Sequence, residues 1–310
     1  MGLFKRKRPE LPRDEALTFM TETQATALRS LVREVFAESG REVVVYADHV
    51  VDDSGGQFGL WNLAALCAPE PQSRWRHLIE EHVRRITAAQ PDFDELSDDE
   101  FRSSLYLRLV EANSLPDRTF YPYARDIGEH LVELLSVDMP EMITTPPEEA
   151  LIRRGDIHSL KQAGLDNLRS VLDQPDVEVQ TIEALGSGRF AVATGESFLT
   201  ASLSLILPEA IARFTDERDA GKGVLVVIPF RHQLAYRVID GDDCAAALNN
   251  LFKWAMLGFG DAPGPLSPHV YWVRDGHWTQ ITRFDEEGRP CVDVSEELAL
   301  ALDLTDEEPG

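Results

Sequence analysis

The residues best suited to bind a ligand are Arg231 and His232, which stand in a short turn between two apolar runs, residues 224–228 and 234–239. Side chains on a turn of a rigid hairpin can reach a ligand, and the planar guanidinium of arginine matches a carboxylate or a phosphate. Two interpretations stay open. The pair binds a ligand, or it covers the turn and interacts with nearby acidic side chains.

A serine nucleophile is the second chemistry to weigh. The Gly-Glu-Ser run at residues 195–197 is half of a nucleophile elbow, but the second glycine of that motif is missing. A serine hydrolase would also need His232 or His269, and an aspartate, to converge on the serine in space. Ser187 stands between two glycines, which is typical of a turn.

Metal and cofactor motifs are absent from the sequence pattern. His77 and His82 are five residues apart, about 140° around a helix, so only one of them can face an ion. Cys67, Cys244 and Cys291 have no paired spacing, which excludes a disulfide framework and a zinc knuckle. The glycine spacings match neither a dinucleotide fingerprint nor a phosphate loop. The sequence therefore predicts no metal and no cofactor.

Two tryptophans flank a predicted hairpin turn at Asp275-Gly276, a pair typical of a type I′ turn. Trp272 and Trp278 each stand three positions from Asp275, so we expect them to be cross-strand neighbours. Such a pair either packs to hold the hairpin or forms an exposed aromatic patch for a protein partner. Both are candidate binding residues.

The composition of the chain limits which classes of partner it can bind and in which cellular compartment it is expected. The 310 residues carry a formal net charge of −24, and a field of that sign repels phosphate backbones, so no nucleic-acid binding is expected. No apolar run is long enough for a membrane span. Unpaired cysteines and the absence of a secretory pattern predict a cytoplasmic protein. The basic residues 5–8 are expected in a solvated tail.

The order of apolar and polar segments predicts an α+β protein made of two helix–antiparallel sheet–helix units with related plans, each sheet covered on one face. We expect a basic flexible tail at 1–13, an N-terminal domain at 14–115, a proline-marked linker region at 116–150, a C-terminal domain at 151–302 and an acidic tail at 303–310.

Periodicity predicts individual elements. Helices are expected at 14–38, 75–86, 101–112 and 159–172, and another from Pro208. Strands are expected at residues 177–185, 189–194 and 196–205, and in the two hairpins at 224–239 and 270–281 that enclose a helix at 243–257.

Several short motifs resemble a known family. They lie at residues 62–63, 166–168, 198–203, 207–208, 226–234 and 265–271. On these motifs the sequence resembles the YtpQ-like bacterial proteins, a family of unknown function. Phe230 and His232 replace an asparagine and an aspartate of the family pattern. The resemblance implies an α+β fold and brings no reaction with it. More loosely, the N-terminal plan looks like the type III secretion chaperone-like fold.

No complete set of nucleophile, base, metal ligands or phosphate loop is visible in the sequence. The leading hypothesis is therefore a protein-binding or chaperone-like adaptor module. The alternative is a hydrolase of unrecognised type that uses the Arg231/His232 turn. A structural subunit that is stable only as a homo-oligomer is the third possibility, and the sequence leaves the oligomeric state open.

Overall fold

The structure of the protein is a computed structural model in which the chain forms two compact units, Met1–Gln90 and Pro91–Gly310. It describes residues 12–52, 57–87, 96–115, 118–139, 142–174, 177–183, 188–215, 217, 221–241, 243–262 and 264–304. The basic residues 5–8, residues 53–56 and residues 305–310 of the acidic tail lie outside the described residues.

The first unit combines helices with a three-stranded antiparallel sheet of order β1-β2-β3. Its elements are α1 (Glu22–Glu38), β1 (Val43–Val45), β2 (His49–Asp52), β3 (Gln57–Gly59), α2 (Trp61–Cys67) and α3 (Gln72–Thr87). The helix expected from residue 14 begins only at Glu22, because Thr21 and Gln24 form a capping box there. Leu17 and Met20 precede the helix and are still fully buried.

The second unit starts with a small antiparallel sheet of order β4-β6-β5, to which β7 adds through β6. Its elements are α4 (Asp98–Ser103), β4 (Leu105–Glu111), β5 (Arg125–Asp126), β6 (Leu131–Met139), β7 (Met142–Thr144), α5 (Glu148–Arg154) and α6 (Ile157–Arg169), with short 3-10 helices at Ala112–Ser114, Arg118–Phe120 and Ser170–Asp173.

A six-stranded antiparallel sheet of order β13-β12-β10-β11-β9-β8 forms the rest of this unit. Its strands are β8 (Glu178–Ile182), β9 (Phe190–Thr194), β10 (Val224–Val227), β11 (Gln233–Val238), β12 (Val270–Arg274) and β13 (His277–Gln280). The remaining elements are the 3-10 helix η5 (Thr200–Ile206), α7 (Leu207–Phe214), α8 (Cys244–Asp261), the ribbon β14 (Thr282–Phe284) and β15 (Pro290–Val292), and α9 (Glu296–Ala301).

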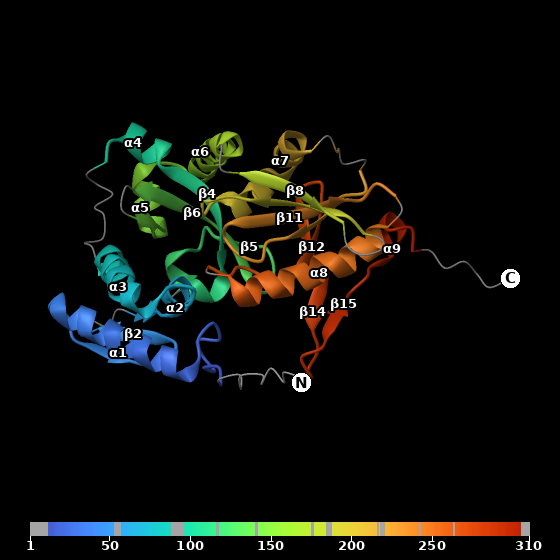
Figure 1. The fold of residues 1–310 in the computed structure, drawn as a ribbon. Helices are drawn as coiled ribbons and strands as arrows, with labels where there is room; N and C mark the ends of the chain where they lie inside the picture. The colour runs from blue at the N-terminus through green and yellow to red at the C-terminus, as the bar shows by residue number, and fades with distance from the viewer. Residues whose placement is uncertain are drawn as a thin grey trace, which may run out of the picture. The chain divides into compact units, whose positions relative to one another are not determined.

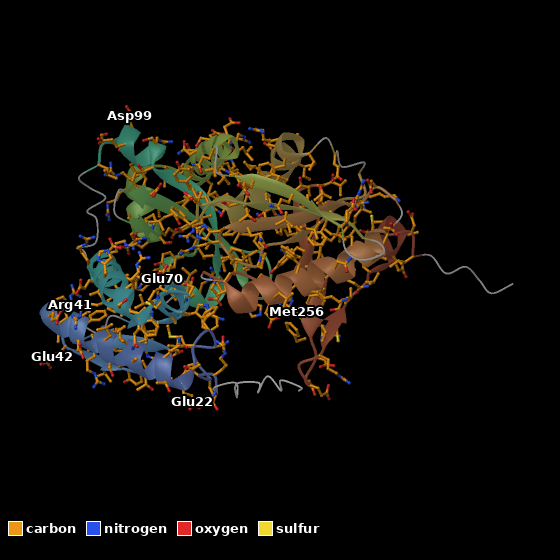
Figure 2. All side chains as sticks on the ribbon, viewed as in Figure 1. Glu22, Arg41, Glu42, Glu70, Asp99 and Met256 are labelled. Atoms are coloured by element: carbon orange, nitrogen blue, oxygen red, sulfur yellow. The ribbon has the colours of Figure 1, made fainter. Side chains whose placement is uncertain are left out.

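Both faces of the four central strands of the six-stranded sheet, β12, β10, β11 and β9, are buried, whereas the edge strands β8 and β13 carry exposed residues. Side chains of β10 alternate between two apolar cores, with Val224 and Val226 in one and Leu225 and Val227 in the other. Helices α7 and η5 contribute to the first core, and α8 and α9 to the second (Figure 1). Met256 of α8 packs against the second core (Figure 2). The expectation of sheets covered on one face is therefore wrong for this sheet.

The α+β class is confirmed, but the expected domain boundaries are wrong. The division falls between residues 90 and 91, so the region expected as the end of an N-terminal domain, residues 96–115, belongs to the second unit. The expected linker at 116–150 contains β5, β6 and β7, and β6 pairs with seven consecutive residues of β4. Among the described prolines of this region, Pro122 lies between a 3-10 helix and β5, and Pro146 and Pro147 precede α5. Sequence alone does not distinguish such prolines from those of a linker.

Two elements predicted from the sequence have a different secondary structure in the protein. The helix expected at 101–112 is the short helix α4 followed by the strand β4, whose apolar residues are buried in the small sheet. The strand expected at 196–205 contains the 3-10 helix η5, six of whose seven residues are buried. An apolar run that is buried on all sides carries no periodic signal for its own conformation. The helix from Pro208 is confirmed as α7.

Both hairpins and the enclosed helix are confirmed, as β10–β11, β12–β13 and α8. Asp275 and Gly276 have φ values of 50° and 75°, as a type I′ turn requires. Among the described helices, none is sufficiently long and apolar to cross a bilayer.

We expect Gly276→Ala to lower the free energy of unfolding by about 1 kcal/mol, because a residue with a Cβ is disfavoured at positive φ. Steric overlap does not contribute, since no atom lies within 4 Å of the added Cβ. The control Gly260→Ala lies in α8, where a Cβ would also meet no atom and no positive φ is present. It should stabilise the protein by about 0.5 kcal/mol. Urea unfolding of the two variants measures both changes in the free energy of unfolding. Equal effects of the two changes would contradict the turn assignment.

Candidate functional site

The structure places Arg231 and His232 in the turn between β10 and β11, as the sequence predicts. The turn is fixed through its backbone: the Arg231 N–H donates to the Gly264 carbonyl at 3.0 Å, and the Arg231 carbonyl accepts from the Ala201 N–H at 3.1 Å. The turn is therefore held against two other segments of the second unit.

His232 has a defined protonation state in this turn. Its Nε2 accepts from Arg231 Nε at 3.0 Å, and its Nδ1 lies 3.2 Å from the Gly195 carbonyl. Because a guanidinium only donates, the ring proton belongs on Nδ1, where it reaches the carbonyl. Burial, together with the charge of Arg231, lowers the pKa of His232 below its usual value. The imidazole is therefore neutral at neutral pH and orients Arg231.

The structure does not assemble the serine-hydrolase set around His232. Ser197 Oγ accepts from the Leu199 N–H at 3.2 Å, whereas the ring nitrogens of His232 contact Arg231 and the Gly195 carbonyl. Ser187 lies outside the described residues. Within the described part of the chain, the Arg231/His232 turn has the chemistry of a binding element and not of a nucleophile–base pair.

The expected pairing of the tryptophans is wrong. In the register of β12 and β13, Trp272 lies opposite Thr279, and Trp278 lies opposite Val273. The two-residue turn pairs positions 274 and 277, so positions 272 and 278 are offset by one and point to opposite faces. Trp272 packs in the core covered by α8, and Trp278 packs against Tyr271 with ring centroids 5.6 Å apart.

The packing role of these side chains follows from their burial. Trp272 is 6% exposed, and its indole N–H donates to the Lys222 carbonyl at 3.0 Å. Trp278 is half-buried and borders an apolar cavity of about 490 Å³. The two tryptophans do not form a common exposed patch.

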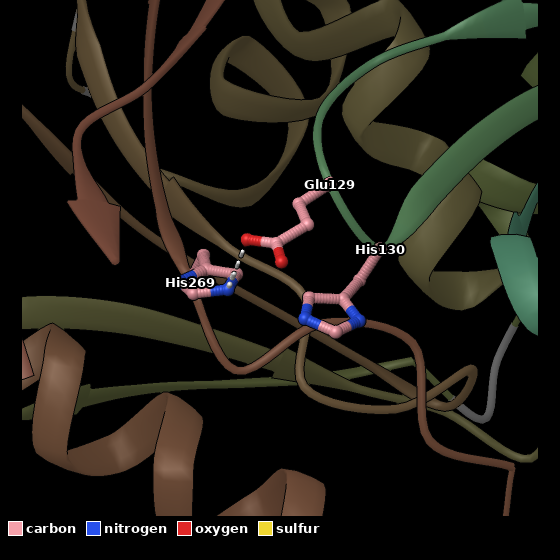
Figure 3. Close-up of side chains that lie close together, drawn as sticks. All are labelled: Glu129, His130 and His269. Atoms are coloured by element: carbon pink, nitrogen blue, oxygen red, sulfur yellow. Dashed lines mark ion pairs between the residues drawn. The ribbon is translucent and has the colours of Figure 1, made fainter. Parts of the chain in front are cut away.

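A cluster of Glu129, His130 and His269 is the strongest site for chemistry that the structure shows (Figure 3). Glu129 and His130 lie in the turn from β5 to β6, and His269 immediately precedes β12. Their ligand atoms all lie within 4.8 Å of one another. His269 Nε2 is 3.9 Å from a Glu129 carboxylate oxygen, and the two imidazole rings stack with centroids 5.2 Å apart.

His269 is the anomalous member of the cluster. Its side chain is fully buried, yet Nε2 has no hydrogen-bond partner among the described residues. Burial, and secondarily the neighbouring His130, lower the pKa of His269 to about 4, although Glu129 acts in the opposite direction. A buried polar atom without a partner is costly. A neutral imidazole with an unused Nε2 is the form that binds a metal ion.

The other ring nitrogen of His269, Nδ1, contacts a side chain that orients the imidazole. Nδ1 lies 3.4 Å from Thr282 Oγ1, and the Val270 N–H donates to the same oxygen at 2.9 Å. In the tautomer whose proton is on Nδ1, the Nε2 lone pair is directed towards Glu129 and His130. Outer hydrogen bonds of this kind fix the tautomer and ring orientation of metal-binding histidines. Phe259 and Phe284 pack beside the histidines.

The sequence did not reveal this cluster because its two parts are 139 positions apart and Glu129-His130 fell in the expected linker. A histidine just before a strand and an adjacent Glu-His pair were its only local signals. The register of β12 with β10 and the turn before β6 bring them together, and no spacing rule predicts that.

The turn that carries Glu129 depends on Gly128. A Cβ there would lie 2.5 Å from Gln280 Oε1 and 2.7 Å from Tyr271 Cε1. Gln280 Oε1 accepts from the Glu129 N–H at 2.9 Å, and Tyr271 is fully buried.

We expect Gly128→Ala to displace this turn and to lower the free energy of unfolding by about 1–3 kcal/mol. The control Gly59→Ala, where a Cβ meets no atom within 4 Å, should change it by less than about 0.5 kcal/mol. Chemical denaturation measures both values. A Gly128→Ala protein as stable as the wild type would show that the close approach is not a constraint.

Comparison of the chain with protein-family models, with curated proteins and with solved structures finds no match. The resemblance to the YtpQ-like family and to the type III secretion chaperone-like fold stays a prediction.

Proposed function

We propose that this protein binds a divalent transition-metal ion through Glu129, His130 and His269, in a centre of the catalytic kind. The observation that carries the proposal is the buried Nε2 of His269, which has no hydrogen-bond partner among the described residues and faces a second imidazole and a carboxylate. A bound cation would supply the partner that this nitrogen lacks.

The donor set selects the class of metal. Two imidazoles and one carboxylate suit zinc, and also iron or another first-row ion, better than magnesium or calcium, which prefer oxygen ligands. Three protein ligands leave at least one coordination position for water, as in catalytic zinc sites. Glu129 is exposed, so this position is accessible from solvent. A metal-bound water of lowered pKa supports hydrolysis as the reaction class.

This proposal keeps the hydrolase function that the sequence offered as the alternative, but places it on different residues. The adaptor function stays a prediction. Because Trp272 is buried, the aromatic pair on the final hairpin does not supply the exposed patch that an adaptor would use.

Calorimetric titration with Zn²⁺ and with Co²⁺ tests the binding. We expect one ion per chain in the wild type, and Glu129→Gln or His130→Ala should weaken binding by at least about 10–100-fold, the loss that removal of even an outer-shell partner produces. His277→Ala is the matched control, since this exposed histidine of β13 belongs to the same unit but not to the cluster. Unchanged affinity in both ligand variants would disprove the proposal.

The open coordination position has its own test. The visible spectrum of the Co²⁺-loaded protein reports the coordination geometry, and we expect added azide to change it by replacing bound water. A spectrum of four-coordinate Co²⁺ that azide does not alter would indicate a closed, structural site, and the catalytic part of the proposal would then be wrong.

A further inference from the structure

A cavity of about 490 Å³ lies at the edge of the six-stranded sheet, next to the β12–β13 hairpin. None of the three residues of the metal cluster lines it, and all of its lining residues belong to the second unit. Small-molecule sites in proteins have volumes of roughly 300–1,000 Å³ and are lined mainly by apolar side chains. The size of this cavity is therefore that of a site for a small organic molecule.

The walls of the cavity continue the first apolar core of the sheet. Val224 pairs with Val273, and Val273 pairs with Trp278, so these three side chains stand in one row on one face of β10, β12 and β13. Leu207 and Ile211, one helical turn apart on α7, line the cavity from the helix. All five side chains belong to the first core or pack against it. The cavity thus extends between α7 and the edge strand β13.

The polar side chains that line the cavity have partners within the protein. The pairs are Arg125 with Glu133, Ser204 with the Ala201 carbonyl, Glu217 with Arg237, and Asp275 with Arg274. The first two are hydrogen bonds, and the last two are ion pairs at 3.8 and 3.9 Å. Each charged lining residue therefore has an oppositely charged neighbour within the described part of the chain, in contrast to the unpartnered Nε2 of His269.

We propose that this cavity binds an uncharged, predominantly apolar organic molecule, which packs between α7 and the row of side chains on the sheet. Burial of apolar surface supplies the affinity, and apolar cavities in proteins bind small apolar molecules. The indole ring of Trp278 adds an aromatic surface for packing. A charged group would leave water without gaining a partner, because the lining charges are already paired. The inference does not rest on the metal centre.

The test of the ligand class uses the full chain after passage over a chelating resin, so that no compound binds through a metal ion. Calorimetry measures the affinity for three compounds that share a ring system and differ in charge: naphthaleneethanol, naphthaleneethylamine and naphthaleneacetate. We expect the alcohol to bind at least about tenfold more tightly than the ammonium or the carboxylate compound, because a charge removed from water needs a partner. Equal or tighter binding of a charged compound would overturn the assignment of an uncharged ligand.

Variants of Ala212 test the location. Ala212 lines the cavity but is exposed on α7, so a larger side chain there does not disturb the core. Ala212→Trp should weaken binding of naphthaleneethanol at least about tenfold because the indole occupies the cavity, and Ala212→Leu should weaken it less. Arg213→Trp is the matched control, since this exposed neighbour on α7 does not line the cavity, and it should bind the alcohol like the wild type.

Urea unfolding of the same variants shows that they are folded, and Ala212→Leu, the smaller change, keeps the test valid if Ala212→Trp is not. No binding of naphthaleneethanol by the wild-type protein would overturn the proposal. An affinity that the folded Ala212 variants leave unchanged, or that Arg213→Trp lowers as much as Ala212→Trp does, would show that the compound binds elsewhere and would overturn it as well.

Discussion

The second unit depends on one constraint: the four central strands of its six-stranded antiparallel sheet are buried on both faces. Alternate residues of β10 must therefore satisfy two cores, with Val224 and Val226 facing one and Leu225 and Val227 facing the other. The strand is apolar throughout, and its neighbour β11 is equally buried. Antiparallel sheets commonly expose one face. Here α7 and η5 on one side and α8 and α9 on the other remove that option (Figure 1).

Because the central strands have no solvated face, polar chemistry on them is confined to their ends. Val227 of β10 pairs with Val270 of β12, so the Arg231/His232 turn and His269 leave the sheet at the same end. Backbone hydrogen bonds join the two segments, from Leu266 N–H to the Pro229 carbonyl and from Arg231 N–H to the Gly264 carbonyl. The proposed metal site uses His269 at this end of the sheet. The buried Nε2 of His269 has no hydrogen-bond partner among the described residues, and a bound ion would supply one.

Local signals predicted a large part of the architecture and only part of the candidate sites. The Asp275-Gly276 turn, the two hairpins and α8 followed from turn chemistry and apolar runs. The sequence also identified Arg231 and His232 as polar residues on an apolar scaffold. It did not identify Glu129-His130, which were assigned to a linker. This pair gains its proposed role from a contact distant in sequence, to His269.

By itself, then, the sequence determined the α+β class, the apolar hairpins and the type I′ turn, because backbone sterics and burial patterns act over a few residues. Only the tertiary structure decided where the units divide, which face each tryptophan takes and which histidine meets which acid. A one-position offset in β12–β13 put Trp272 and Trp278 on opposite faces. The pairing of β12 with β10 and the turn before β6 brought His269 to Glu129 and His130. Such juxtapositions depend on strand register and sheet order, which no local spacing encodes.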